Sequence, residues 1–365
     1  MKKIPKWFRK LLFFIILLFM FFFPLPFYLE VPGSIFPLSD MVEVDHQYEE
    51  LSGEYYITTV GVKQATPVTI FQTFLPYHDL VSESKLLGNL DNFENYNRIQ
   101  KYNMNHSINS AIKVAFDAAG KSYDLDYKGV YVLQVIEASD FFAKLEVGDI
   151  VESVDGQKFQ SSAKFMDYIG NKNVGEKIRL EVKRAGEEID ISGNLIELEN
   201  GASGIGIALT DNSEIVTEPS VQIHSADIGG PSAGLMFAID IYTQLIDKSL
   251  SKGYRIAGTG TIESDGQIGR IGGVEKKIVA AARENVDYFF VPDDEPQSGE
   301  KKLNSTYQSN YDLAQETADK INTGLMIIPV KKFQDALDFL NALKRNKNVD
   351  DEKENINLAT IRTTN

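Results

Sequence analysis

The sequence of 365 residues predicts a multidomain protein of mixed α+β and α/β structure with an apolar helix at its N-terminus. Three observations predict this fold class. An uncharged apolar run extends from Leu11 to Leu29. Short strand patterns separated by glycine-containing turns follow Gly129. From Gly204 onward, strand patterns alternate with helical patterns, as in α/β proteins.

The first segment, residues 1–30, is typical of a cytoplasmic basic tip and a transmembrane helix. Its basic residues before the apolar run are Lys2, Lys3, Lys6, Arg9 and Lys10. The run is close to the roughly 20 residues that cross a bilayer. A cleaved signal peptide is the alternative, but no small-residue cleavage site follows the run. The positive-inside rule therefore predicts a single-pass protein of the cell membrane with a cytoplasmic N-terminus and extracellular C-terminal domains.

Composition excludes several function classes. The formal net charge of −15 disfavours nucleic acid as a partner, because phosphate binding requires basic patches. The chain has no cysteine, so it forms no disulfide and offers no thiolate as metal ligand or nucleophile. We expect no metal and no cofactor.

Residues 31–120 form the predicted N-terminal extracellular region. It contains a strand near 53–60, a polar bridge from Ser82 to Asn105 and a helix over 107–119. The segment "AFDAAGKS" differs from the consensus of a phosphate-binding loop at one position. Ala115 replaces the first glycine of that consensus, and the pattern before it is helical where the motif needs a strand. We therefore expect no ATP binding.

The next segment, residues 121–198, resembles a PDZ domain in the words "GVYV" and "LEVGDIVESVDG". The resemblance implies a groove between the strand that begins at Gly129 and a helix near Ser162 to Ile169, where a peptide pairs as an added strand. The peptide-binding residues that it implies are Gly129, Val130, Tyr131 and Val132. Tyr127 and Lys128 replace the first two residues of the family's Gly-apolar-Gly-apolar loop. The alternative is a PDZ domain that only packs against its neighbour.

Ser232 lies in "GGPSAG" at the start of a helical pattern and matches the G-x-S-x-G pattern of esterases. That mechanism needs a histidine after the serine. All four histidines precede it: His46, His78, His106 and His224. A lysine in an apolar site is the remaining base. Lys276 and Lys277 both lie in the first turn of a predicted helix, and apolar periodicity favours Lys277 as the inward-facing one.

The words "GGPSAG", "GTGTIESDGQIGRIGGVEKKIVAAA" and "YFFVP" resemble the proteolytic domain of Lon, a family of Ser-Lys peptidases, over residues 199–345. The resemblance implies Ser232 as nucleophile, Lys277 as base and Thr259 as a residue that supports the lysine. Gly229 departs from the family, which commonly has an acidic residue there. The charged tail, 346–365, is predicted to be disordered.

The order of anchor, PDZ domain and Lon-type domain resembles a group of membrane-anchored proteases of Gram-positive bacteria that includes SepM-like and YlbL-like proteins. In several of these the PDZ domain is an insertion, so the strand near 53–60 is a candidate strand of the protease sheet. The group implies an ATP-independent serine endopeptidase that cuts short or flexible secreted peptides, peptide pheromones among them. Its partners would be a peptide or protein substrate and the membrane. The alternative function is a non-catalytic surface adaptor in which the PDZ domain recruits a partner.

Overall fold

The computed structural model describes residues 5–48, 51–225, 228–296 and 307–346, and the chain forms two compact units. The first unit combines the segments up to Val42, Tyr48–Asn89 and the chain from Ser232 onward. The second consists of Glu43–Gln47 and Leu90–Pro231. The second unit is thus inserted in the sequence of the first. The predicted tail over 346–365 lies, apart from residue 346, outside the described residues.

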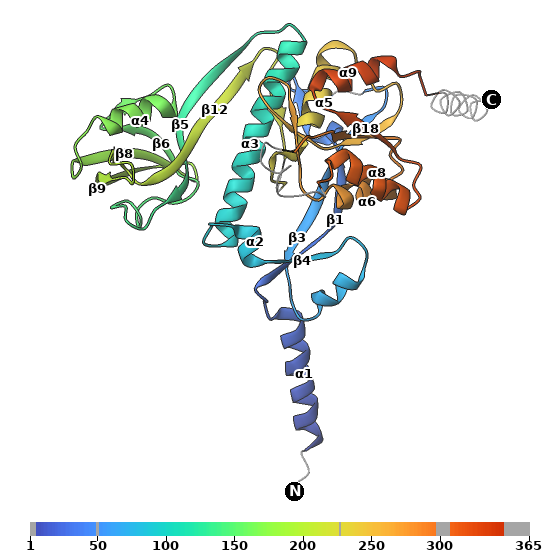
Figure 1. The fold of residues 1–365 in the computed structure, drawn as a ribbon, viewed down its shortest axis with the longest axis horizontal. Coiled ribbons are helices and arrows are strands. Elements are labelled where there is room, and N and C mark those ends of the chain that lie inside the picture. Colours follow the sequence, from blue (N-terminus) through green and yellow to red (C-terminus); the bar gives the residue numbers. More distant parts are fainter. Residues whose placement is uncertain (1–4, 49–50, 226–227, 297–306, 347–365) are drawn as a thin grey trace, which may run out of the picture. The chain divides into compact units, whose positions relative to one another are not determined.

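A six-stranded mixed sheet forms the centre of the first unit (Figure 1). In spatial order its strands are β18 (Met326–Val330), β17 (Tyr288–Pro292), β14 (Arg255–Gly258), β3 (Glu54–Gln64), β1 (Phe27–Pro37) and β4 (Asp79–Ser82). β18, β17, β14 and β3 run parallel, and β1 pairs antiparallel with β3 and β4. The strand predicted near 53–60 is β3, and its pairing with β14 places it in the same sheet as the strands that follow Ser232.

Helices cover both faces of this sheet. Among the described residues, the helices of the unit are α1 (Lys6–Phe22), α2 (Glu83–Leu87), α5 (Gly234–Ile246), α6 (Val274–Arg283), α8 (Asn310–Lys320) and α9 (Phe333–Ala342). Side chains alternate along β3: Tyr56 joins the core beneath α6 and α8, whereas the hydroxyl of Tyr55 contacts Thr243 of α5 at 3.2 Å. α6 and α5 therefore lie on opposite faces. A small hairpin of β15 (Thr261–Ile262) and β16 (Ile268–Gly269) follows β14.

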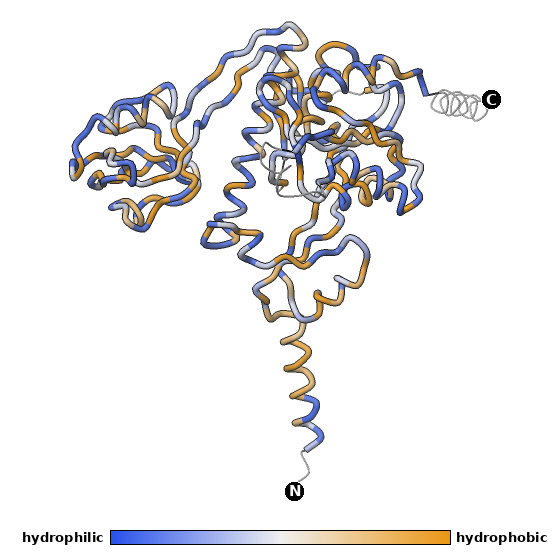
Figure 2. The backbone as a smooth tube through the Cα atoms, in the orientation of Figure 1, coloured by the Kyte–Doolittle hydropathy of each residue, from blue (hydrophilic) through white to orange (hydrophobic). Residues whose placement is uncertain are grey.

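The apolar run at the N-terminus forms a shorter helix than predicted. α1 ends at Phe22, and the prolines at 24 and 26 follow it, because proline cannot continue a helix. The last residues of the run, Phe27–Leu29, already belong to β1, where Leu29 is buried. In the described part of the chain, no helix combines the length and the hydrophobicity that crossing a membrane requires. The predicted membrane-crossing run from Leu11 to Leu29 is divided between α1 and β1. Figure 2 shows α1 as a hydrophobic segment after its basic start.

The second unit contains a twisted antiparallel sheet, the helix α4 (Ser162–Gly170) and the long helix α3 (Phe93–Ala118). Along the sheet the strands are β12 (Ile207–Thr217), β5 (Tyr123–Val135), β6 (Ile150–Val154), β8 (Lys177–Arg184) and β9 (Glu187–Asn194), with β7 (Gln157–Lys158) paired to β6. Asp155 and Gly156 both have positive φ and form the hairpin turn between β6 and β7. Two short pairs join β10 (Ile196–Glu197) to β11 (Ser203–Gly204) and β2 (Val42–Val44) to β13 (Val221–Ile223).

Three further element predictions differ from the structure. α3 begins at Phe93, so much of the predicted polar bridge is helical, and Asn92 caps it by accepting the N–H of Asn95. α8 lies in a stretch where no helix was predicted from the sequence. β12 falls within the segment 199–345 yet pairs along its length with β5.

Candidate active site

Ser232 lies in a short 3-10 turn, Pro231–Ala233, that leads directly into α5. The helix packs closely on β14, because a side chain at Gly258 would place its Cβ 2.5 Å from Sδ of Met236 and 2.9 Å from Cβ of Phe290. A glycine at this position therefore lets the start of α5 approach the carboxyl end of β14. That end is the usual place for sites in parallel sheets.

Main-chain hydrogen bonds fix Ser232 to the residues that follow β14. The N–H of Gly260 donates to the carbonyl of Ser232 at 2.8 Å, and Oγ1 of Thr259 donates to the same carbonyl at 3.1 Å. The N–H of Leu235 in turn donates to the carbonyl of Gly260 at 3.2 Å. The carbonyl of Ser232 thus accepts two hydrogen bonds from residues 259–260, and the bond from Leu235 fixes the start of α5 to the same segment.

Lys277 comes from α6, on the other face of the sheet, and meets Ser232 beyond the end of β14. Its Nζ lies 2.6 Å from Oγ of Ser232 and 2.9 Å from Oγ1 of Thr259. α6 begins after Gly273, whose φ is +65° and whose Cβ would lie 2.8 Å from the side chain of Val60. Glycine is needed there for both reasons. The structure therefore brings Ser232, Thr259 and Lys277 together within hydrogen-bond distance.

The two adjacent lysines of α6 have opposite electrostatic environments. Burial lowers the pKa of Lys277 to about 7, since only 3% of the residue is exposed and the ammonium form loses its hydration. Burial also disfavours the charged form of Lys276, but its hydrogen bonds to Asp79 and Glu275 outweigh this and raise its pKa. Glu30 lies 3.7 Å from the same Nζ. Lys276 is therefore a charged structural residue, whereas Lys277 has a neutral amine available near pH 7.

The glycine-rich turn before Ser232 offers fewer free amides than its sequence indicates. The N–H of Gly230 donates to the carbonyl of Gln100 in α3 at 2.8 Å. At Gly229, where the Lon family commonly has an acidic residue, an added Cβ would lie 2.8 Å from Cβ of Gln100. Nε2 of His224 lies 3.3 Å from a carboxylate oxygen of Glu43, and the side-chain base that hydrogen-bonds to Oγ of Ser232 is Lys277.

The four residues predicted to bind peptide lie in β5, and both edges of β5 are occupied at these positions. On one edge Gly129, Val130, Tyr131 and Val132 face Asn212, Asp211, Thr210 and Leu209 of β12. On the other edge Val130 and Tyr131 face Val151 and Ile150 of β6. A peptide strand cannot add to a strand whose two edges are paired, so β5 offers no free edge for strand addition at these positions.

The open edge of this sheet beside α4 belongs to β12. No other strand of the described residues pairs with its outer edge, and α4 contacts it, with the N–H of Ser162 donating to Oδ1 of Asp211 at 2.6 Å. The signal that could have identified this strand is Gly204-Ile205-Gly206-Ile207. It is the Gly-apolar-Gly-apolar pattern that residues 127–130 lack, and Gly206 has a φ of +78°.

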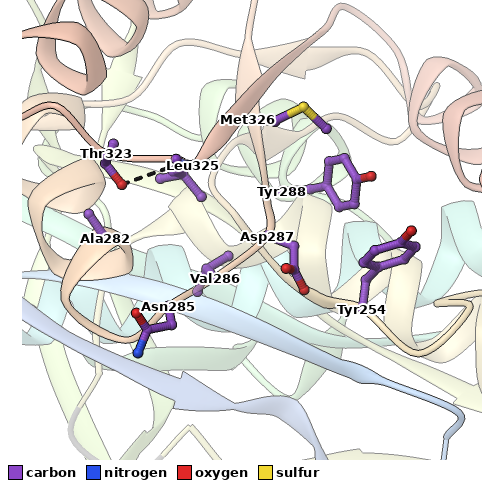
Figure 3. A pocket seen from close by; sticks show the side chains of 10 residues that line it. Tyr254, Ala282, Asn285, Val286, Asp287, Tyr288, Thr323, Leu325 and Met326 are labelled. Carbon is purple, nitrogen blue, oxygen red and sulfur yellow. Dashed lines mark hydrogen bonds between the residues drawn. The ribbon is translucent and has the colours of Figure 1, made fainter. Parts of the chain in front are cut away.

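A separate cavity of about 410 Å³ lies at the opposite ends of the parallel strands (Figure 3). Its lining includes Tyr254 before β14, Asp287 before β17 and Leu325 before β18, whereas Thr259 follows β14. One carboxylate oxygen of Asp287 accepts the N–H of Arg255 at 2.8 Å. The cavity is therefore distinct from the Ser232 site.

Two segments of the chain match known protein families. Residues 97–195 match the PDZ domain, and residues 208–341 match the Lon protease (S16) C-terminal proteolytic domain. Among curated proteins, a Lon protease of Mesomycoplasma hyopneumoniae is 34% identical over 30% of this chain and 11% of its own length. Lon protease 2 of Borreliella burgdorferi is 23% identical over 61% of this chain and 27% of its own length. The chain thus spans about a tenth to a quarter of the length of these relatives.

Among solved structures, the PDZ domain of an SdrC-like protein from Listeria monocytogenes is 34% identical. The match covers 23% of this chain and 88% of that one, with a TM-score of 0.22. Together the family matches show that the chain combines a PDZ domain with a Lon-type proteolytic domain and has Lon proteases as homologues.

Proposed function

We propose that the chain is a serine endopeptidase in which Ser232 is the nucleophile and Lys277 the general base. The observation that carries the proposal is the distance of 2.6 Å between Oγ and Nζ, together with the burial that lowers the pKa of the lysine to about 7. A nucleophile within hydrogen-bond reach of a neutral base is the arrangement that acyl transfer requires.

The reaction follows from this geometry. The neutral Nζ of Lys277 accepts the hydroxyl proton of Ser232 while Oγ bonds to the peptide carbonyl carbon. The resulting ammonium gives that proton to the leaving nitrogen as the C–N bond breaks, which leaves an acyl-enzyme. Water then attacks the ester, with Lys277 again taking and returning one proton. Thr259 accepts an N–H of the amine and keeps its lone pair directed at Ser232.

A pair of matched substitutions tests the proposal on the full chain. Lys277→Arg keeps a cation that cannot act as a base, because the pKa of arginine exceeds 12. We expect it to abolish cleavage of fluorescein-labelled casein in the absence of ATP, as does Ser232→Ala. Lys276→Arg, one position away, keeps its charge and should retain activity. Cleavage by Ser232→Ala or Lys277→Arg would contradict the proposal, and no cleavage by the native chain would favour the adaptor function.

We further propose that peptides, secreted peptides and peptide pheromones among them, are captured at the outer edge of β12. Support comes from the unpaired edge beside α4 and from the Gly-Ile-Gly turn that precedes the strand. An aspartate introduced either in β12 or in β5 tests which of the two strands binds the peptide. Ile207→Asp should weaken binding of arrayed peptides to the full chain, whereas Lys128→Asp should leave it unchanged. The reverse result would return the site to β5.

The location of the protein stays a proposal. We propose that α1 attaches the chain to a membrane, with the protease outside the cytoplasm. No residue of α1 is buried, and the N–H of Val68 donates to the carbonyl of Met20 at 3.1 Å, which places the short 3-10 helix Thr69–Phe74 near the end of α1. In this 3-10 helix Phe71 and Phe74 are 61% and 83% exposed. Such exposed apolar surface is typical of contact with lipid.

Because the chain has no native cysteine, single labels can test this directly. A fluorophore on Phe74→Cys in liposome-reconstituted protein should be quenched by nitroxide lipids. The same fluorophore on Met326→Cys, a half-exposed position of the first unit, should not be. Equal quenching at both positions, or at neither, would contradict membrane attachment through this surface.

A further inference from the structure

Helix α3 holds the segment that leads into Ser232. The N–H of Gly230 donates to the carbonyl of Gln100, and Oγ of Ser107 donates to the carbonyl of Pro231, both at 2.8 Å. Ser107 is only 2% exposed. Gly229 lies so close to α3 that an added Cβ would contact Gln100 at 2.8 Å. Three consecutive residues are thus fixed to one helix, and the peptide bond after Pro231 joins them to Ser232.

The same helix also binds β12. The hydroxyl of Tyr102 donates to the carbonyl of Asp211 at 2.8 Å. The side-chain amide of Asn109 donates to the carbonyl of Ser213 at 2.6 Å and accepts the N–H of Ile215 at 3.2 Å. These side chains bond to backbone groups of Asp211, Ser213 and Ile215, in addition to the pairing of β12 with β5. Among the described residues, none of these three bonds reaches the beginning of β12, next to the Gly-Ile-Gly turn.

We propose that Ser107 is a positioning residue for the nucleophile and that α3 links it to the peptide-capturing strand β12. This inference rests on the proposed function. All the contacts that carry it, from β12 to Pro231, lie within the second unit. They make the position of the chain just before Ser232 dependent on how α3 is held by β12.

The physical basis is the strictness of nucleophile geometry. A displacement of about 1 Å in a reacting group costs on the order of 100-fold in rate. The hydroxyl of Ser107 is one of two α3 groups that hold residues 230–231, so its loss should permit a fraction of that displacement. We expect Ser107→Ala to lower kcat about 10-fold while KM changes little, because the groups that bind substrate are untouched.

The test measures the rate at which a fluorophosphonate probe labels Ser232 in the full chain. This probe reports nucleophile geometry without requiring the natural substrate. Labelling of the native chain and its loss in Ser232→Ala first establish that the nucleophile is reactive. Failure of this step would overturn the proposed function and, with it, the inference. If the native chain is labelled, Ser107→Ala should react about 10-fold more slowly.

The matched control is Ser110→Ala, which removes another buried serine hydroxyl from α3. In the part of the chain that the structure describes, no hydrogen bond joins Ser110 to residues 228–231, so it should label at the native rate. Tyr102→Phe removes only the hydroxyl that bonds to Thr210 and Asp211 of β12, and it should slow labelling by 2- to 5-fold with an unchanged melting temperature. Because this change is remote from Pro231, it separates positioning from misfolding. Native labelling rates in both Ser107→Ala and Tyr102→Phe would overturn the inference.

Discussion

The pH dependence of peptide cleavage is the most direct consequence of the buried amine. Lys277 must be neutral to accept a proton, and burial lowers its pKa to about 7. Its neutral fraction is then about 10% at pH 6 and about 90% at pH 8, whereas a lysine at its ordinary pKa of 10.5 is only about 0.03% neutral at pH 7. The environment therefore raises the reactive fraction at pH 7 by about 1,000-fold, and holding the amine neutral costs about 5 kcal/mol.

The assay is kcat/KM for an internally quenched peptide without titratable side chains, measured from pH 5 to pH 10. We expect a tenfold rise per pH unit below about 7 and a plateau above about 8. Lys276→Arg should show the same midpoint, because its charge is compensated by carboxylates. A midpoint near 10, or no change of rate between pH 6 and pH 8, would refute the assignment of Lys277 as the base.

Three other perturbations have defined outcomes. Thr259→Val removes the oxygen that accepts an N–H of Lys277 and should lower kcat about 10- to 100-fold with little change in melting temperature, as steady-state kinetics and calorimetry can show. Lys277→Met should abolish activity yet stabilise the fold by about 2 kcal/mol at pH 7. The folded-state pKa of this lysine is depressed, so the native chain gains stability from about pH 7 to pH 10.5 and the variant should not, as urea titrations can test. Burial raises the pKa of Asp240 to about 7, so the native chain loses stability as pH rises from about 4 to 7. Asp240→Asn should therefore have a higher melting temperature than the native chain at pH 7.5 and the same melting temperature at pH 4.

The pairing of Ser232 with Lys277 could be predicted because two local signals lie in segments that resemble the Lon proteolytic domain. A serine between small residues at a helix start and a lysine in the first turn of a second helix are both visible as short words of sequence. Their distance of 2.6 Å, in contrast, depends on Gly258 and Gly273, which let two helices approach one sheet from opposite faces. Close packing of this kind has no pattern in a single sequence.

The sequence did not identify β12 as the strand with an open edge, because strand pairing is non-local. "GVYV" has the pattern of an accessible strand, but β12, more than seventy residues further along the chain, covers its edge. Polar composition likewise concealed the first half of α3. That half is held by tertiary hydrogen bonds such as the one from Tyr102 to Asp211, which propensity does not reveal. The end of the N-terminal helix, in contrast, is visible in the sequence, because Pro24 and Pro26 interrupt the apolar run.

The insertion of one unit into the other has a consequence for biogenesis. β3 ends at Gln64, and its neighbour β14 begins only at Arg255, so the central sheet cannot close until most of the polypeptide has been synthesised. The intervening unit has its own sheet and apolar core and can fold before β1 and β3 pair with β14. Ser232 and Lys277 are likewise among the later residues to emerge. A nascent or truncated chain therefore lacks the proposed Ser232–Lys277 pair, which forms only with the last third of the molecule.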